Sequence, residues 1–230
     1  MGKMMNDHYI LPQNFYPMLK FRDYLHLGII RNYRKGESIV FPGETIDSII
    51  FVLSGKLGIS FMHENGKQKF MYHADPYTFI DEALGIFTSS YVHVVSEEDS
   101  SVCFFEKFQF LMILHENKEL LLEFITCFSS KRCYFMHEAS EAVLYKPSVR
   151  ILRFFYLLCN TQGKLVDNVY EINVKISQRA ISEITGVHFI TVNKILRYLK
   201  KENILNKTRS KIIIYDFPQL KVLIEDWMNH

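Results

Sequence analysis

The segment from Ser177 to Lys200 combines side chains that can bind phosphate with apolar residues at helical spacing. The candidates for contact with a nucleic acid are the imidazole, hydroxyl, amide, basic and apolar side chains of its second half: His188, Phe189, Ile190, Thr191, Asn193, Lys194 and Arg197. Hydroxyl, imidazole and free backbone N–H groups near a helix N-terminus bind phosphate oxygens. The candidates for contact with base edges are Phe189, Ile190, Asn193 and Lys194. This chemistry predicts binding to double-stranded DNA, with an ordinary helical hairpin as the alternative.

Two short helices must position these side chains. Ile181 and Ile184 supply the apolar face of the first helix, and Gly186 allows a tight turn. The second helix has its own apolar face, formed by Val192, Ile195, Leu196 and Leu199. The pattern predicts a helix-turn-helix whose second helix is free to enter a major groove.

Basic residues cluster around this segment although the whole chain has a net charge of only +2. Between Lys175 and Lys211 only Glu183 and Glu202 oppose them. The bases are Arg179, Lys194, Arg197, Lys200, Lys201, Lys207, Arg209 and Lys211. Lys207 and Arg209 precede a β-branched run, which predicts a wing whose basic tip contacts phosphates. A merely solvated charged face is the alternative.

A long helix is predicted upstream, because residues 108–144 contain neither proline nor glycine. Its apolar residues are spaced by three and four up to one interruption: Leu121, Phe124, Phe128, Phe135 and Ala142. Such spacing is typical of helices that pack against a second copy, so we expect a homodimer.

The interruption is Lys131, whose ammonium group lies in or beside the apolar row. A buried lysine is costly unless an anion pairs with it. We therefore expect Lys131 to bind an anionic effector, together with Tyr134 and, from the preceding domain, Tyr72 and His73. The alternative is that the long lysine stem carries its charge out to water.

Short runs rich in Ile, Val, Phe and Tyr follow Tyr33, and turn signals such as Pro42-Gly43 and Asn65-Gly66 separate them. This spacing predicts a compact antiparallel sandwich or barrel. At the far end of the long helix, Pro147 suits the first turn of a new helix.

The composition is that of an ordinary globular protein, with 48% hydrophobic and 23% charged residues among 230. We expect a cytoplasmic protein with no membrane association, because the chain has no long uncharged apolar run and no secretory signal. The four cysteines show no zinc spacing and are expected to be reduced. We find no nucleophile–base pair and no glycine-rich phosphate loop, so an enzyme is not expected.

The strings KGE from Lys35, FPGE from Phe41 and FVLSGKLGIS from Phe51 resemble the opening of the cyclic-nucleotide-binding β-roll. With the helix-turn-helix that follows, the chain resembles the Crp/Fnr family of transcription regulators. The resemblance implies an α+β protein with an N-terminal β-roll, a long dimerisation helix and a C-terminal winged helix-turn-helix domain. It also implies DNA and RNA polymerase as partners. The expected divisions are an arm (1–20), an effector-binding β-roll (21–107), a dimerisation helix (108–146), a DNA-binding domain (147–219) and a C-terminal helix (220–230).

Members of that family that bind cyclic nucleotides hold the phosphate with a Gly-Glu pair and a later Arg-Ser or Arg-Thr pair. Here Glu82 matches the glutamate, but Asp81 replaces the glycine and no arginine occurs from Ile80 to Val102. A buried phosphate without a guanidinium partner is costly. We therefore expect an effector other than cyclic AMP.

The strings YKPSVRILRFFYLLC, QGK, YEI and SQRAISEITGVH resemble one branch of the family, the CprK-type regulators of organohalide respiration. That resemblance implies a halogenated phenol as effector, no cofactor, and a pocket lysine at Lys131. Glu82 stands where that branch has another pocket lysine. A redox, heme or gas sensor of the same fold, using His73, His93, Cys127 or Cys133, is the alternative.

Many family members carry Arg and Glu at the positions of Phe189 and Ile190, where these charged residues read guanine and cytosine. Apolar side chains contact thymine methyl groups instead. We therefore predict that the dimer binds an A·T-rich palindrome.

Overall fold

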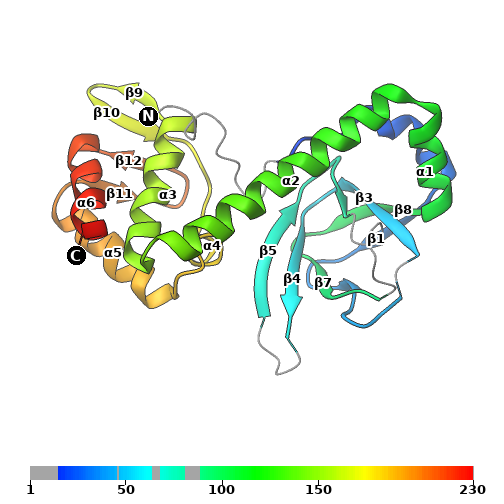
Figure 1. The fold of residues 1–230 in the computed structure, drawn as a ribbon, viewed down its shortest axis with the longest axis horizontal. Coiled ribbons are helices and arrows are strands. Elements are labelled where there is room, and N and C mark those ends of the chain that lie inside the picture. Colours follow the sequence, from blue (N-terminus) through cyan, green and yellow to red (C-terminus); the bar gives the residue numbers. More distant parts are fainter. Residues whose placement is uncertain (1–14, 46, 64–67, 81–88, 230) are drawn as a thin grey trace. The chain divides into compact units, whose positions relative to one another are not determined.

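The computed structural model describes residues 15–229 except 46, 64–67 and 81–88. The chain divides into two compact units, one of residues 10–134 and one that includes residues 135–230. Figure 1 labels most elements of both units. None of the helices among the described residues is long and apolar enough to span a membrane.

Two four-stranded antiparallel sheets form a β-roll in the first unit. Their strand orders are β1-β8-β3-β6 and β2-β7-β4-β5. The strands are β1 (Ile29–Tyr33), β2 (Ser38–Val40), β3 (Ser48–Ser54), β4 (Leu57–Met62), β5 (Gln68–Ala74), β6 (Phe79–Ile80), β7 (Val92–Ser96) and β8 (Ser100–Glu106). The predicted Asn65-Gly66 turn lies outside the described residues, but β4 and β5 pair on either side of it, from Leu57↔Ala74 to Met62↔Gln68.

Aromatic side chains fill the interior of the roll. Phe21 makes edge-on contacts with Phe79 and Phe105, at ring-centroid distances of 4.8 and 5.0 Å, and all three residues are fully buried. Each such ring contributes about 1.5–3 kcal/mol by its burial. Alternation along the strands turns Phe79 and Phe105 inward, and Phe21 packs against them from η1.

The helices of this unit differ from the prediction at one place. A 3₁₀ helix, η1, spans Leu19–Leu27, and β1 begins at Ile29. The single long helix is divided into α1 (Lys107–Glu116) and α2 (Lys118–Leu144).

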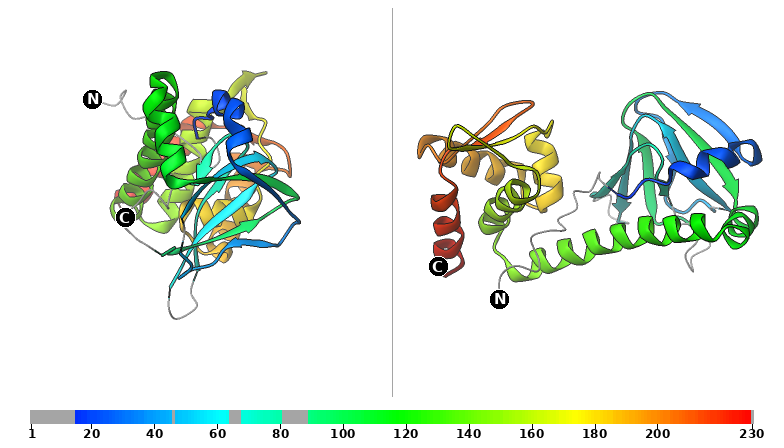
Figure 2. Two further views of the ribbon diagram at one scale, coloured as in Figure 1. Left: turned by 90° about the vertical axis from the view of Figure 1, so that its right-hand side faces the viewer. Right: turned by 90° about the horizontal axis from the view of Figure 1, so that it is seen from above.

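Asn117 causes the division of the long helix. Its side-chain oxygen accepts the N–H groups of Glu119 and Leu120, both at 3.1 Å, and so starts a new helix. The first part of α2 then runs along one side of the roll (Figure 2).

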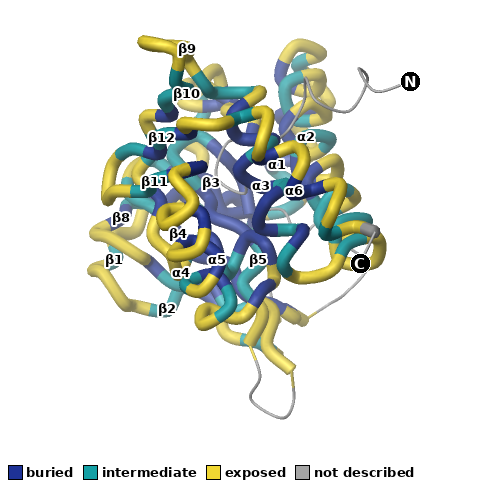
Figure 3. Tube along the Cα trace, turned by 90° about the vertical axis from the view of Figure 1, so that its left-hand side faces the viewer, coloured by how far each residue is buried: buried dark blue, intermediate teal, exposed yellow. Residues whose placement is uncertain are grey.

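The second unit surrounds helix α3 (Pro147–Gln162), whose first residue is the proline expected there. A four-stranded antiparallel sheet, in the order β11-β12-β10-β9, completes it. Its other elements are β9 (Lys164–Val166), β10 (Val169–Ile172), α4 (Gln178–Thr185), α5 (Phe189–Lys201), β11 (Leu205–Lys207), β12 (Ile212–Ile214) and α6 (Phe217–Asn229). The last helix thus begins at Phe217 and not at 220. Figure 3 shows the exposed tip formed by β9 and the buried stretches of α3.

A bidentate ion pair joins the end of α2 to α3 within this unit. Arg153 donates to both carboxylate oxygens of Glu141, at 2.7–3.1 Å, and its guanidinium lies 4.0 Å from the centre of the Tyr145 ring. Such a pair has fixed geometry, and it ties the two helices together across the turn at Pro147.

Gly186 adopts the left-handed conformation, with φ 60° and ψ 26°, and ends α4. Replacing it with alanine is expected to destabilise the protein by about 1–2 kcal/mol, because a Cβ disfavours this conformation. In a thermal unfolding experiment, the melting temperature of this variant should be a few degrees below that of the wild type. Gly186→Asn is the matched control, since asparagine tolerates positive φ better; an equal loss for both variants would contradict the backbone explanation.

Candidate nucleic-acid interface and effector pocket

The helix-turn-helix forms from α4 and α5 as its apolar pattern predicted. Ile181, Val192 and Leu199 are fully buried, and they anchor both helices to the unit's core. The Ser177 side chain caps α4 by accepting the N–H of Ala180 at 2.9 Å. Ser182 donates to the carbonyl of Val187 at 2.6 Å and fixes the turn from the inside. These contacts hold α5 rigidly on one side and leave its other side in solvent.

The predicted DNA-contacting residues of α5 lie on or beside that solvent face. Exposed are His188, Phe189, Ile190, Lys194 and Arg197, while Thr191 and Asn193 are half-buried. Phe189 and Ile190 are 43% and 56% exposed, although both are large and apolar. Both side chains are therefore accessible to another molecule.

The first turn of α5 has an unusual cap. The Nδ1 atom of His188 accepts the N–H of Ile190 at 3.3 Å, a long hydrogen bond. The positive end of the helix dipole is also at this point, so an oxyanion approaching α5 meets a favourable field.

The predicted wing is the hairpin of β11 and β12, and Arg209 lies exposed in its turn. Lys207 is half-buried at the end of β11 and donates to the Thr208 carbonyl at 3.0 Å. Burial lowers the pKa of Lys207. Arg209 is therefore the freer of the two charges for a phosphate contact.

Lys131 lies on the face of α2 that is turned toward the roll, not in the exposed apolar row. The buried residues of α2 are Leu120, Cys127, Lys131 and Tyr134. Phe128, which the sequence placed in line with Lys131, is 50% exposed. Phe128 and Lys131 are only three residues apart, so the boundary between the exposed and the buried side of the helix passes between them. That Lys131 interrupts a dimer-forming row stays a prediction.

Lys131 is 4% exposed, so its ammonium group does not reach water. It donates to the backbone carbonyl of Phe79, and its Nζ lies 5.0 Å from the centre of the Tyr72 ring. Tyr134 follows one turn later on the same face and is equally buried. A cation is therefore held among aromatic rings and a carbonyl oxygen, a setting that suits an anionic aromatic ligand.

The other two predicted effector residues fare differently. His73 lies next to Tyr72 on β5, and the alternation of the strand turns it to the opposite face, where its Nε2 lies 3.0 Å from Glu97. The structure therefore does not bring His73 to Lys131, which corrects the expected grouping. Glu82 lies outside the described residues.

Phe15 is a neighbour of this cluster that no pattern in the sequence indicated. Its ring lies edge-on to Tyr72 and Tyr134, at centroid distances of 5.4 and 5.9 Å, and it is 5% exposed. It precedes η1 in an arm without periodicity, so its partners could not be assigned before the fold was known.

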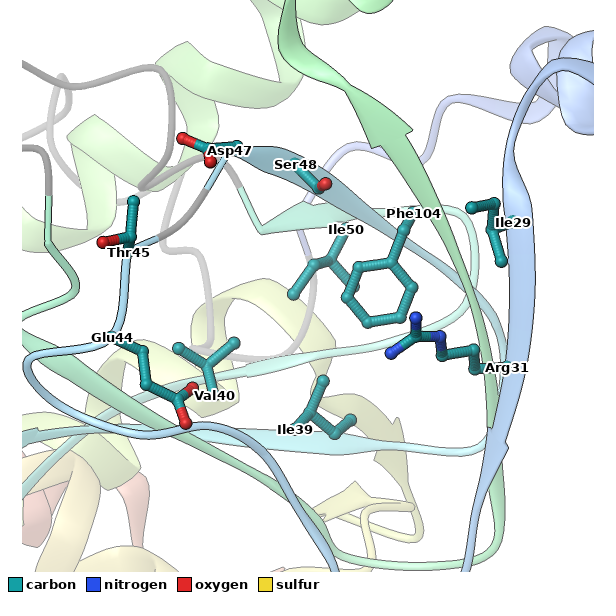
Figure 4. Close-up of a pocket in the computed structure, with 10 residues that line it drawn as sticks. All are labelled: Ile29, Arg31, Ile39, Val40, Glu44, Thr45, Asp47, Ser48, Ile50 and Phe104. Atoms are coloured by element: carbon teal, nitrogen blue, oxygen red, sulfur yellow. The ribbon is translucent and has the colours of Figure 1, made fainter.

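A separate cavity of about 250 Å³ opens on another side of the roll (Figure 4). Its wall includes Arg31, stacked 5.2 Å from the Phe104 ring, and the carboxylates of Glu44 and Asp47. Among the residues that the structure describes, none of the predicted effector residues lines this cavity. The buried charge of Lys131 and its neighbouring rings lie outside this cavity.

The cysteines bear on the redox alternative. Cys127 is buried and Cys133 exposed, on different faces of α2, so these two cannot form a disulfide with each other without unwinding the helix. The described residues also contain no group of three or more side chains suited to a metal ion. His93 accepts or donates a hydrogen bond at 2.9 Å with Ser38.

Burial raises the pKa of the Cys103 and Cys159 thiols to about 11. At pH 8 on the order of one in a thousand of these thiols is ionised, and only the thiolate reacts. We expect iodoacetamide at pH 8 to alkylate the exposed Cys133 first, as peptide mapping by mass spectrometry will show. Modification of Cys103 or Cys159 at the rate of Cys133 would contradict the buried positions of those two.

The two parts of the chain match two family models. Residues 30–117 match the cyclic nucleotide-binding domain and residues 149–223 the Crp-like helix-turn-helix domain. A sensor roll joined to a DNA-reading helix pair defines a class of protein, the effector-responsive DNA-binding transcription regulator.

Known proteins agree with this class. The structure of CprK complexed with OCPA is 36% identical, with a TM-score of 0.86 over 92% of this chain and 98% of its own. Oxidized CprK in complex with o-chlorophenolacetic acid is also 36% identical, with a TM-score of 0.54 over 94% and 91%. The global nitrogen regulator of Synechocystis sp. is 22% identical over 82% of this chain and 85% of its own. The chain belongs to the Crp/Fnr family.

Proposed function

We propose that this protein is a transcription regulator whose DNA binding is switched on by a halogenated aromatic anion. The observation that carries the proposal is the burial of the Lys131 ammonium group against the Tyr72 ring and the Phe79 carbonyl. Chlorine acidifies a phenol, so a chlorophenol enters as a phenolate that can pair with the ammonium group. The CprK structures with aryl ligands support the same class of effector.

Residues 21–107 serve as the sensor in this proposal, 108–146 as the dimerisation segment and 147–219 as the DNA-binding domain. The exposed apolar side chains of α2 suit packing against a second copy. In the first unit they include Leu122, Ile125 and Phe128, which are 49–64% exposed. A dimer places two α5 helices on half-sites about 34–36 Å apart, one turn of DNA. From such an operator, in the cytoplasm, the dimer contacts RNA polymerase as an activator.

The effector acts by population shift, because an anion that binds one arrangement of the dimer more tightly favours that arrangement. The operator is expected to be rich in A·T pairs, since Phe189 and Ile190 suit thymine methyl groups. Asn193 and Lys194 supply polar contacts, and His188, Thr191, Arg197, Lys207 and Arg209 contact the backbone.

Selection from a random duplex library, with and without o-chlorophenolacetic acid, tests the proposal. We expect an A·T-rich palindrome to be recovered only with the ligand, and the ligand to raise the melting temperature of the free protein. Recovery of the same sites without any aromatic anion, or of G·C-rich single half-sites, would refute it. An absorption band of bound heme, or loss of binding on oxidation, would favour the gas or redox sensor instead.

A further inference from the structure

The segment Phe15–Met18, here called the strap, lies across the cluster formed by Tyr72, Lys131 and Tyr134. It has no regular secondary structure. Two backbone hydrogen bonds hold it: the N–H of Tyr16 donates to the Ser130 hydroxyl at 3.2 Å, and that of Met18 to the Tyr77 carbonyl at 2.8 Å. The strap is thus fastened to α2 beside Lys131 and to the roll near Tyr72.

The Phe15 ring is the part of the strap that enters the cluster. Its interplanar angles with Tyr72 and Tyr134 are 83° and 70°, the edge-to-face arrangement that aromatic pairs prefer. Tyr16, the next residue, is 46% exposed and turns away. The phenyl ring of Phe15 therefore already occupies the surfaces of the two tyrosines beside Lys131.

An aromatic effector needs the same surfaces, since its anion must reach Lys131 and its ring must pack on the tyrosines. We infer that Phe15 occupies the effector's ring position and that an aromatic anion binds by displacing it. The inference rests on the proposed function, of which it describes the regulation. It also limits the effector to a single ring of about the size of phenylalanine's.

The strap can leave more easily than a helix or strand. Met18 is fully buried and Phe21 lies in the core, so the anchor is on the C-terminal side of Phe15. N-terminal to Met18, the described contacts that hold the strap are the Tyr16–Ser130 hydrogen bond and the ring contacts of Phe15. Segments with so few backbone hydrogen bonds open locally at small cost.

Titration of wild type and Phe15→Ala with o-chlorophenolacetic acid and with phenol, by calorimetry, tests the inference. Removing a ring that makes two edge-to-face contacts is expected to tighten binding of both probes by roughly ten-fold. Tyr16→Ala is the matched control, because it keeps the Phe15 ring and the backbone N–H, and it is expected to bind as wild type does. Equal or weaker binding by folded Phe15→Ala would overturn the inference.

Two further arms separate this inference from the proposed function. If o-chlorophenolacetic acid binds wild type and Phe15→Ala equally, the displacement is wrong while the effector site stands. If wild type binds neither probe but Phe15→Ala binds phenol, the displacement stands and the proposed effector class fails. Should Phe15→Ala not fold, Ser130→Ala loosens the strap without a cavity; it is expected to tighten binding two- to three-fold, on the order of one weak hydrogen bond, and unchanged binding would overturn the inference.

Discussion

Lys131→Met is expected to abolish the response to the aromatic anion while leaving the protein folded. Methionine keeps the length and apolar character of the lysine stem, but it removes the buried charge that the anion requires. Truncating one partner of a buried charge pair costs about 2–5 kcal/mol, which corresponds to a loss in affinity of roughly 30- to several thousand-fold. Calorimetry measures the loss directly.

The stability of the same variant gives an independent check. Replacing a buried ion by an apolar side chain of similar volume is often neutral or stabilising. The melting temperature without ligand should therefore stay the same or rise. Arg132→Met is the matched control, since the neighbouring Arg132 is exposed. This variant should keep the ligand affinity and the melting temperature of the wild type. Unchanged ligand affinity in Lys131→Met would remove Lys131 from the site.

Replacing the thymines of the selected operator with deoxyuridine is expected to weaken binding by about 1 kcal/mol for each methyl contact that is lost, which is the scale of burying one methyl-sized group. Uracil lacks only the methyl group, so every hydrogen bond to the bases remains. We expect the apolar side chains of Phe189 and Ile190 to supply the other half of this contact, and both are exposed at the start of α5.

A double-mutant cycle identifies the residue responsible. Ile190→Ala and Phe189→Ala should each bind the thymine operator more weakly than wild type does. If the replaced residue is the one that touches the methyl group, its alanine variant should bind the thymine and uracil operators with equal affinity. Thr208→Ala, in the wing, serves as the control and should show the full methyl effect. If the uracil operator binds wild type as tightly as the thymine operator, hydrogen bonds and shape must account for the specificity instead.

The parts of the fold that follow from periodicity were predictable from the sequence. Ile181, Val192 and Leu199 repeat at helical spacing because they share one core, so the pattern and the packing report the same fact. The order of motifs then predicted the roll and the DNA-binding domain together.

What escaped prediction depends on single contacts that leave no repeating pattern. Asn117 divides a helix through one side-chain cap, although the sequence around it is helical throughout. Tyr72 and His73 are both plausible ligands by residue type, but alternation allows only one of them to face Lys131, and the pairing register decides which. Phe15 reaches its partners from a distant part of the chain, so only the folded structure brings them together.

The cap of α5 limits how tightly a phosphate could be held at the start of this helix. The N–H of Ile190 already has an acceptor in the imidazole of His188. A phosphate oxygen that takes this N–H must displace the imidazole, so the gain is the difference between two acceptors and not a whole hydrogen bond. The exchange keeps the helix end satisfied both on and off DNA, and it favours rapid release from sites where Phe189 and Ile190 find no methyl group.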